Sequence, residues 1–172
     1  MPNLLGATPE SDAKDFARLW SADRGGLGFC PDEIKIYPTQ LVKNAGLYQE
    51  WIEGRYRPYD TETLIELIAA VKPTIPPYCR VNRVIRDIPS HHVVAGNRRT
   101  SLRMDIQRRV RENGQTCACI RCREIRGQPV SPEELTLRDT VYQAAYAEEH
   151  FLQFIASDKL NQIGRASCRE RV

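Results

Sequence analysis

Three cysteines within six residues form the segment of this 172-residue chain with the clearest chemistry. Cys117, Cys119 and Cys122 follow an Asn113-Gly114 turn, in the order Cys-Ala-Cys-Ile-Arg-Cys. Thiolates this close together in a loop can converge on one tetrahedral metal ion, with a fourth ligand supplied from elsewhere. The wider gaps of an iron–sulfur ligand run are missing, so the spacing favours zinc over iron. The alternative is a set of free thiols.

Two other cysteines are candidates for the fourth ligand. Cys79 stands at the start of a predicted strand, beside a proline-rich turn, and is the better candidate. Cys30 is the second. Spacing alone does not decide between them.

A block of arginines surrounds this segment. Residues 79–126 carry 12 basic and 4 acidic side chains, a net charge of +8, and all 12 are arginine. Residues 1–78 carry −3 and residues 127–162 carry −4. Arginine binds phosphate in a bidentate manner, so the block predicts a polyanion site. A solvated helix face is the alternative.

Three side chains on predicted strands could serve a site. Lys35 and Tyr37 share one face of EIKIY, near the end of the strand where α/β barrels place functional groups. Arg83 lies on the inward side of RVNRVI, where a guanidinium needs an anion or a carboxylate. A structural pair with Asp87 is the alternative for Arg83. No third ligand stands near His91 and His92, which we interpret as part of a polar loop.

The elements that would position these residues alternate between strand and helix. The pattern predicts strands at 33–37 and 79–85, and helices at 9–20, 46–53, 61–71 and 98–112. This order implies βαβ units with a parallel sheet, hence an α/β fold. Residues 134–144 and 149–156 predict an appended antiparallel β hairpin.

Composition excludes other classes of protein. Hydrophobic residues make up 41% and charged residues 27%, which is typical of a globular domain. No apolar run approaches the roughly 20 residues of a membrane span, and the first residues do not form a secretory signal. We therefore expect a cytoplasmic protein without membrane contact. The last ten residues, IGRASCRERV, read like an adapter sequence, and we set 163–172 aside as an artefactual tail.

Several segments, in order, resemble the catalytic subunit of Elongator, in its bacterial or archaeal form. They are MPNLLGATPESD, PDEIKIYPT, GLYQEWIEGRYRPYD, RVNRVIRDIP, GNRR and CACIRCRE. The resemblance runs from residue 1 to about residue 162. Members of that family join a radical S-adenosylmethionine (SAM) enzyme to an acetyltransferase-like domain, and they modify C5 of the wobble uridine of tRNA with acetyl-CoA.

The resemblance implies an α/β fold that is the C-terminal half of a partial TIM-like radical SAM barrel, with a zinc loop and an appended antiparallel β hairpin. Residues 1–112 would be the second half of the barrel and 113–127 the zinc-binding loop. Residues 128–162 would link to an acetyltransferase domain. The three cysteines that hold the family's 4Fe-4S cluster lie upstream of MPNL and are absent here, so we expect an internal fragment that is inactive by itself.

Family roles carry over to individual positions. Lys35 and Tyr37 match catalytic positions at the barrel mouth, and Met1, Asn3 and Arg83 match cofactor-binding positions there. Cys117, Cys119 and Cys122 match the zinc loop. The expected RNA contacts are the arginines at positions Arg98, Arg99, Arg103, Arg108 and Arg109.

The sequence therefore predicts part of a tRNA-modifying acyltransferase, a carboxymethyluridine synthase of the radical SAM class. Zinc would bind this chain, whereas the 4Fe-4S cluster, S-adenosylmethionine and acetyl-CoA belong to the whole enzyme. Its partners would be tRNA and a homo-oligomer or an Elongator-like assembly. The alternative is a stand-alone zinc-containing RNA-binding module without catalysis.

Overall fold

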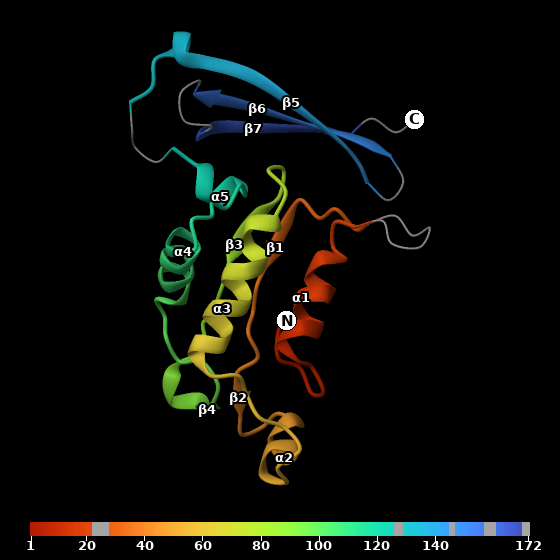
Figure 1. The fold of residues 1–172 in the computed structure, drawn as a ribbon, viewed down its shortest axis with the longest axis vertical. Helices are drawn as coiled ribbons and strands as arrows, with labels where there is room; N and C mark the ends of the chain where they lie inside the picture. Colours follow the sequence, from red (N-terminus) through yellow and green to blue (C-terminus); the bar gives the residue numbers. More distant parts are fainter. Residues whose placement is uncertain (22–27, 126–128, 145–146, 157–160, 170–172) are drawn as a thin grey trace. The chain divides into compact units, whose positions relative to one another are not determined.

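A computed structural model describes residues 1–21, 28–125, 129–144, 147–156 and 161–169 of the chain (Figure 1). The chain divides into two compact units. The first comprises Met1–Ala17, Ile34–Thr74 and Asn82–Cys117, and the second comprises Arg18–Glu33, Ile75–Val81 and Ala118–Val172.

Helix α3 (Thr61–Val71) forms the centre of the first unit. The side chain of Asp60 caps its start by accepting a hydrogen bond from the Thr63 amide at 2.7 Å. Leu64, Ile65 and Ile68 are at most 2% exposed, so an apolar face at helical spacing supplies the core. The helix packs against α1 (Pro9–Ala17) and α4 (Leu102–Glu112), which lie on either side of it in Figure 1.

The expected helices are present with shifted ends. Helix α1 ends at Ala17 and not at Trp20, and α4 begins at Leu102, four residues later than predicted. The side chain of Arg98 bonds the carbonyls of Val93 and Val94, so the residues before α4 belong to a loop. The short helix α2 (Leu47–Ile52) lies within the predicted range.

Strands β1 (Glu33–Lys35) and β3 (Arg80–Arg83) pair with each other, and α3 lies between them in the chain. The Arg80 amide donates to the Asp32 carbonyl at 2.7 Å, and the Ile36 amide donates to the Arg83 carbonyl at 2.9 Å. Both strands therefore run in the same direction, which confirms the predicted βαβ unit. Each strand is shorter than predicted: β1 ends at Lys35, and a bend at 84–85 follows the end of β3.

A second small sheet was not predicted. Strand β2 (Leu41–Val42) pairs antiparallel with β4 (Val93–Ala95), with a register shift between Leu41 and Val42. Gly96 has φ +99°, and a Cβ there would meet the Thr39 carbonyl oxygen at 3.1 Å, so this close approach needs glycine. A 3₁₀ turn, Ser90–His92, leads into β4.

In the second unit, three strands form one antiparallel sheet in the order β5-β6-β7. Strands β5 (Leu135–Gln143) and β6 (Glu148–Ala156) are the predicted hairpin. Strand β7 (Asn161–Arg169) pairs with the other edge of β6, although we had set 163–172 aside. Backbone pairing with a free strand edge needs no apolar alternation, which explains why the sequence pattern missed it.

Candidate functional site

The chain after α4 brings the three thiols together. Gly114, at φ +67°, follows the end of α4, and a single turn of helix, α5 (Ile120–Arg123), begins six residues after it. The Cys122 amide donates to the Cys119 carbonyl at 3.0 Å, which places these two side chains one helical turn apart on the same face. The sulfur atoms of Cys117, Cys119 and Cys122 all lie within 4.8 Å of one another.

This geometry fits one metal ion. Zn²⁺ bound by thiolates at ~2.3 Å in a tetrahedron holds its sulfur atoms about 3.8 Å apart, so the three thiols need to close only slightly around it. In a cubane iron–sulfur cluster each thiolate binds a different iron, so the sulfurs stand farther apart. In the described part of the chain, no other three His, Cys, Asp or Glu side chains converge in this way.

Lys72 is a component of the site that the sequence analysis missed. Its side chain is fully buried, and its Nζ lies 3.1 Å from the sulfur of Cys117. A buried ammonium needs an anionic partner, and a thiolate supplies one. The signal was present in the sequence: Leu64, Ile68 and Lys72 continue one buried face at a spacing of four, so a lysine occupies the last position of an apolar stripe.

Arg123 holds the cysteine loop to the rest of the second unit. Its Nε donates to the Ala118 carbonyl at 2.6 Å, and its two terminal nitrogens donate to the Pro77 carbonyl and to Oε1 of Gln153 at 2.7 and 2.8 Å. Gln153 is 1% exposed. These bonds fix the backbone around Cys119 before any metal binds.

Of the two candidates for a fourth ligand, Cys79 lies beside the cysteine loop. Its carbonyl accepts a hydrogen bond from the Ile120 amide at 3.0 Å. Burial, together with the charge of Cys119, raises the pKa of the Cys79 thiol to about 12. Cys79 is not part of the group whose sulfurs lie within 4.8 Å, and Cys30 instead donates to the Gln143 carbonyl at 3.5 Å.

The candidate barrel-mouth residues gather at the carboxyl ends of the parallel strands. Lys35 is exposed at the end of β1, Tyr37 is half-buried two residues later, and Arg83 is exposed at the end of β3. Arg83 forms an ion pair with Asp87 at 2.5 Å, so the structural alternative for this arginine is present. Parallel strands place their carboxyl ends at one edge, which brings Lys35 and Arg83 to the same side of the pair.

The first residues of the chain join this edge. The Thr39 amide and hydroxyl both donate to the Pro2 carbonyl, at 3.1 and 2.9 Å. Asn3 is 3% exposed at φ +66°, and its side-chain oxygen accepts from the Tyr59 amide at 2.7 Å. Met1 is 65% exposed. Asn3 therefore anchors the segment, while Met1 remains accessible.

The predicted RNA-contacting arginines fall into two groups. Arg109 pairs with Glu62, Glu66 and Glu112, and Arg103 donates to the Asn82 carbonyl at 3.0 Å, so both are engaged within the fold. The other three are exposed, and they differ in their contacts. Arg98 donates to the carbonyls of Val93 and Val94. Arg99 pairs with Asp105, and Arg108 pairs with Asp105 and Glu112.

Comparison with known proteins identifies the class of protein to which the chain is similar. Residues 31–112 match the radical SAM C-terminal domain, which covers the parallel strands and their helices. The chain is 42% identical over 166 residues to a tRNA uridine(34) acetyltransferase of Dehalococcoides mccartyi, and 34% identical over 174 residues to mouse Elongator complex protein 3. These alignments cover 93% and 99% of this chain.

A solved structure of archaeal Elp3 from Methanocaldococcus infernus, with an N-terminal deletion, superposes with a TM-score of 0.90 at 31% identity over 99% of this chain. The chain belongs to the family of tRNA uridine(34) acetyltransferases and Elongator complex protein 3, which confirms the resemblance inferred from its motifs. It spans about a third of the length of these relatives, 35% and 31%, and 41% of the archaeal structure. None of the described helices is long and apolar enough to cross a membrane.

Proposed function

We propose that this chain is the later half of the radical SAM barrel, the zinc loop and the following hairpin of an enzyme that modifies C5 of the wobble uridine of tRNA. The whole enzyme would use S-adenosylmethionine radical chemistry and acetyl-CoA. One observation carries the proposal: the solved structure of archaeal Elp3 superposes on 99% of the chain with a TM-score of 0.90. The relatives named tRNA uridine(34) acetyltransferases support it.

The cysteines of this chain suit zinc and do not suit the 4Fe-4S cluster. Three sulfurs within 4.8 Å match a single ion, and the sequence contains no second run of three closely spaced cysteines. The cluster would be bound by cysteines of the whole enzyme that are not among the residues of this chain. By itself the chain would be inactive.

Cys117, Cys119 and Cys122 would hold the zinc, with Cys79 as the fourth ligand. Four thiolates and one Zn²⁺ carry a net charge of −2, and the ammonium of Lys72, 3.1 Å from the sulfur of Cys117, offsets one of these charges. A zinc ion bound by this many sulfur atoms has a structural role and fixes the loop.

The barrel-mouth residues would act on the substrate in the whole enzyme. Lys35 would offer an ammonium and Tyr37 a hydroxyl at the barrel mouth, and Met1, Asn3 and Arg83 would bind the cofactor there. The exposed guanidinium of Arg83, which pairs with Asp87 in this structure, would exchange that carboxylate for an anionic group of the cofactor. The tRNA backbone would contact the exposed arginines of the +8 block.

Two measurements test this proposal. The purified chain should contain about one zinc and should not cleave S-adenosylmethionine, even after anaerobic iron–sulfur reconstitution. Joined to an upstream segment that carries the cluster cysteines, it should recover cleavage. Formation of 5′-deoxyadenosine by the unextended chain would contradict the proposal, because it would mean that Cys117, Cys119 and Cys122 hold iron.

The second candidate is a zinc-containing RNA-binding module without catalysis. It is favoured by the position of the cysteine group and the arginine block, which both lie within this chain. A chain that binds zinc and RNA, and that gains no cleavage when the upstream segment is added, would support this module. A homo-oligomer or an Elongator-like assembly belongs to the first proposal and is testable by sedimentation with and without tRNA.

A further inference from the structure

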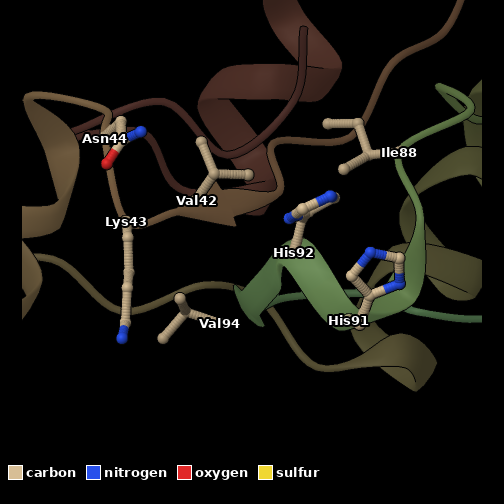
Figure 2. A pocket seen from close by; sticks show the side chains of 7 residues that line it. All are labelled: Val42, Lys43, Asn44, Ile88, His91, His92 and Val94. Carbon is tan, nitrogen blue, oxygen red and sulfur yellow. The ribbon is translucent and has the colours of Figure 1, made fainter.

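A cavity of about 440 Å³ lies in the first unit, between the β2–β4 pair and the 3₁₀ turn before β4. Val42 and Val94 form an apolar side of it, and Ile88 lies opposite (Figure 2). The polar lining comes from Lys43, Asn44, His91 and His92. The two histidines are the motif to which neither the sequence analysis nor the proposed function gave a role.

The charge of this lining has one sign. It contains one lysine, two imidazoles and an amide, and no aspartate or glutamate. A neighbouring cavity of about 390 Å³ shares Ile88 and is lined by Arg86, Arg98 and Asp87, so it holds charges of both signs and no aromatic ring. The cavity beside His91 and His92 combines a cation with two rings, which suits a ligand that has both an anionic group and an aromatic ring.

The shape and chemistry of the lining suit a nucleotide. Imidazole rings serve as stacking surfaces for bases in single-stranded RNA recognition, and a lysine ammonium pairs with a phosphate. The rings of His91 and His92 have centroids 4.1 Å apart and are tilted by 49°, so they form a folded aromatic surface and not a parallel stack. The volume exceeds the need of a single inorganic ion and falls in the range of small-molecule sites, about 300–1,000 Å³.

A metal ion fits this cavity poorly. Two histidines without a third ligand make an incomplete set, and no group of three metal-ligating side chains is found there among the described residues. The valines and Ile88 also present carbon to the interior, where a metal would need oxygen or nitrogen.

We propose that this cavity binds one nucleotide of single-stranded RNA, with the base against His91, His92 and the apolar wall and the phosphate at Lys43. The inference rests on the proposed function in that it takes the nucleotide to belong to the tRNA substrate. The site is separate from the cysteine loop, and its occupant is an anion with an aromatic ring.

The three histidines of the chain permit a direct test. In ¹H–¹³C spectra of the histidine rings of the full chain, titration with uridine monophosphate should shift the signals of His91 and His92 together and saturably. His150 lies on β6 with its Nδ1 2.6 Å from Asp139, so its signal should stay in place. Inorganic phosphate and uridine, tested separately, should each bind more weakly than the nucleotide.

Substitutions separate the two contacts. Lys43→Gln should weaken binding of uridine monophosphate about two- to fivefold, as expected for a partly exposed ion pair, and leave uridine unchanged. Lys14→Gln, on the exposed side of α1, is the matched control and should change neither. His92→Ala should weaken both nucleotide and uridine.

The inference fails if uridine monophosphate shifts neither His91 nor His92, or if it shifts His150 equally. It also fails if S-adenosylmethionine shifts both rings and the nucleotide does not. These results are independent of the zinc content and of S-adenosylmethionine cleavage. The proposed function can therefore fail while the nucleotide site is supported, and the nucleotide site can fail while the proposed function is supported.

Discussion

Replacement of Lys72 by methionine tests the link between the buried ammonium and the cysteine group. Methionine keeps an unbranched stem of similar length and removes the charge. Two unit charges 3.1 Å apart attract by about 5 kcal/mol at an effective dielectric constant of about 20. The cost of burying the ammonium offsets much of this, and the metal takes up part of the thiolate charge.

The net contribution of the Lys72 ammonium to zinc affinity should match that of other groups that contact a metal ligand. Substitution of such groups lowers metal affinity about 10–100-fold. We therefore expect Lys72→Met to bind zinc with the same stoichiometry and about 10–100-fold lower affinity, measured by competition with a chromogenic chelator. Lys72→Arg keeps the charge and should retain most of the affinity. Lys14→Met, which removes an exposed lysine of α1, should match the wild type.

An unchanged zinc affinity in a folded Lys72→Met chain would refute the reasoning, since the charge balance would then have no energetic role. A chain that binds zinc as tightly with methionine as with lysine, but loses affinity with arginine, would point to packing as the cause. Circular dichroism of the metal-free variants establishes that each is folded before the titration.

Three further predictions follow from other parts of the structure. Asp60→Ala removes the cap of α3 and should lower the free energy of unfolding by about 0.5–2 kcal/mol in a urea titration, and Asp60→Asn should restore most of it; equal stability of all three chains would contradict the capping role. Arg99→Gln should reduce the slope of log affinity against log salt for tRNA by about 0.7–0.9, while Arg109→Gln, whose guanidinium is surrounded by Glu62, Glu66 and Glu112, should leave the slope nearly unchanged. Equal effects of the two substitutions would mean that the arginine block attracts RNA through its summed charge and not through individual phosphate contacts. Arg123→Met removes the donors to Ala118, Pro77 and Gln153 and should lower zinc affinity, whereas Arg121→Met, which leaves those three bonds in place, should change it little.

Sequence patterns predicted the elements whose residues carry a strong periodic signal. The βαβ unit around α3 follows from Asp60 and the apolar face of Leu64 and Ile68, and the hairpin follows from β-rich runs with a short turn. The β2–β4 pair is too short to show any period, and β7 pairs through its backbone, so neither left a pattern to find.

The site was predictable where its residues are neighbours in the chain. The sulfur atoms of Cys117, Cys119 and Cys122 lie within 4.8 Å of one another, because six residues of chain leave little freedom for the thiols to separate. Lys72 reaches Cys117 across 45 residues of sequence, and that contact depends on how α3 packs against α4. The ion pairs of Arg109 also depend on this packing, because its partners Glu62 and Glu66 lie on α3. The net charge of a segment does not show which arginines are paired in this way.

The zinc content of the purified chain tests the central claim most directly. Elemental analysis combined with X-ray absorption at the zinc edge should find about one zinc per chain, bound by three or four sulfur atoms at ~2.3 Å. Cys119→Ser should lose the metal, since one of the three converging thiolates is removed. A chain without metal, or one that holds iron in place of zinc, would contradict the account.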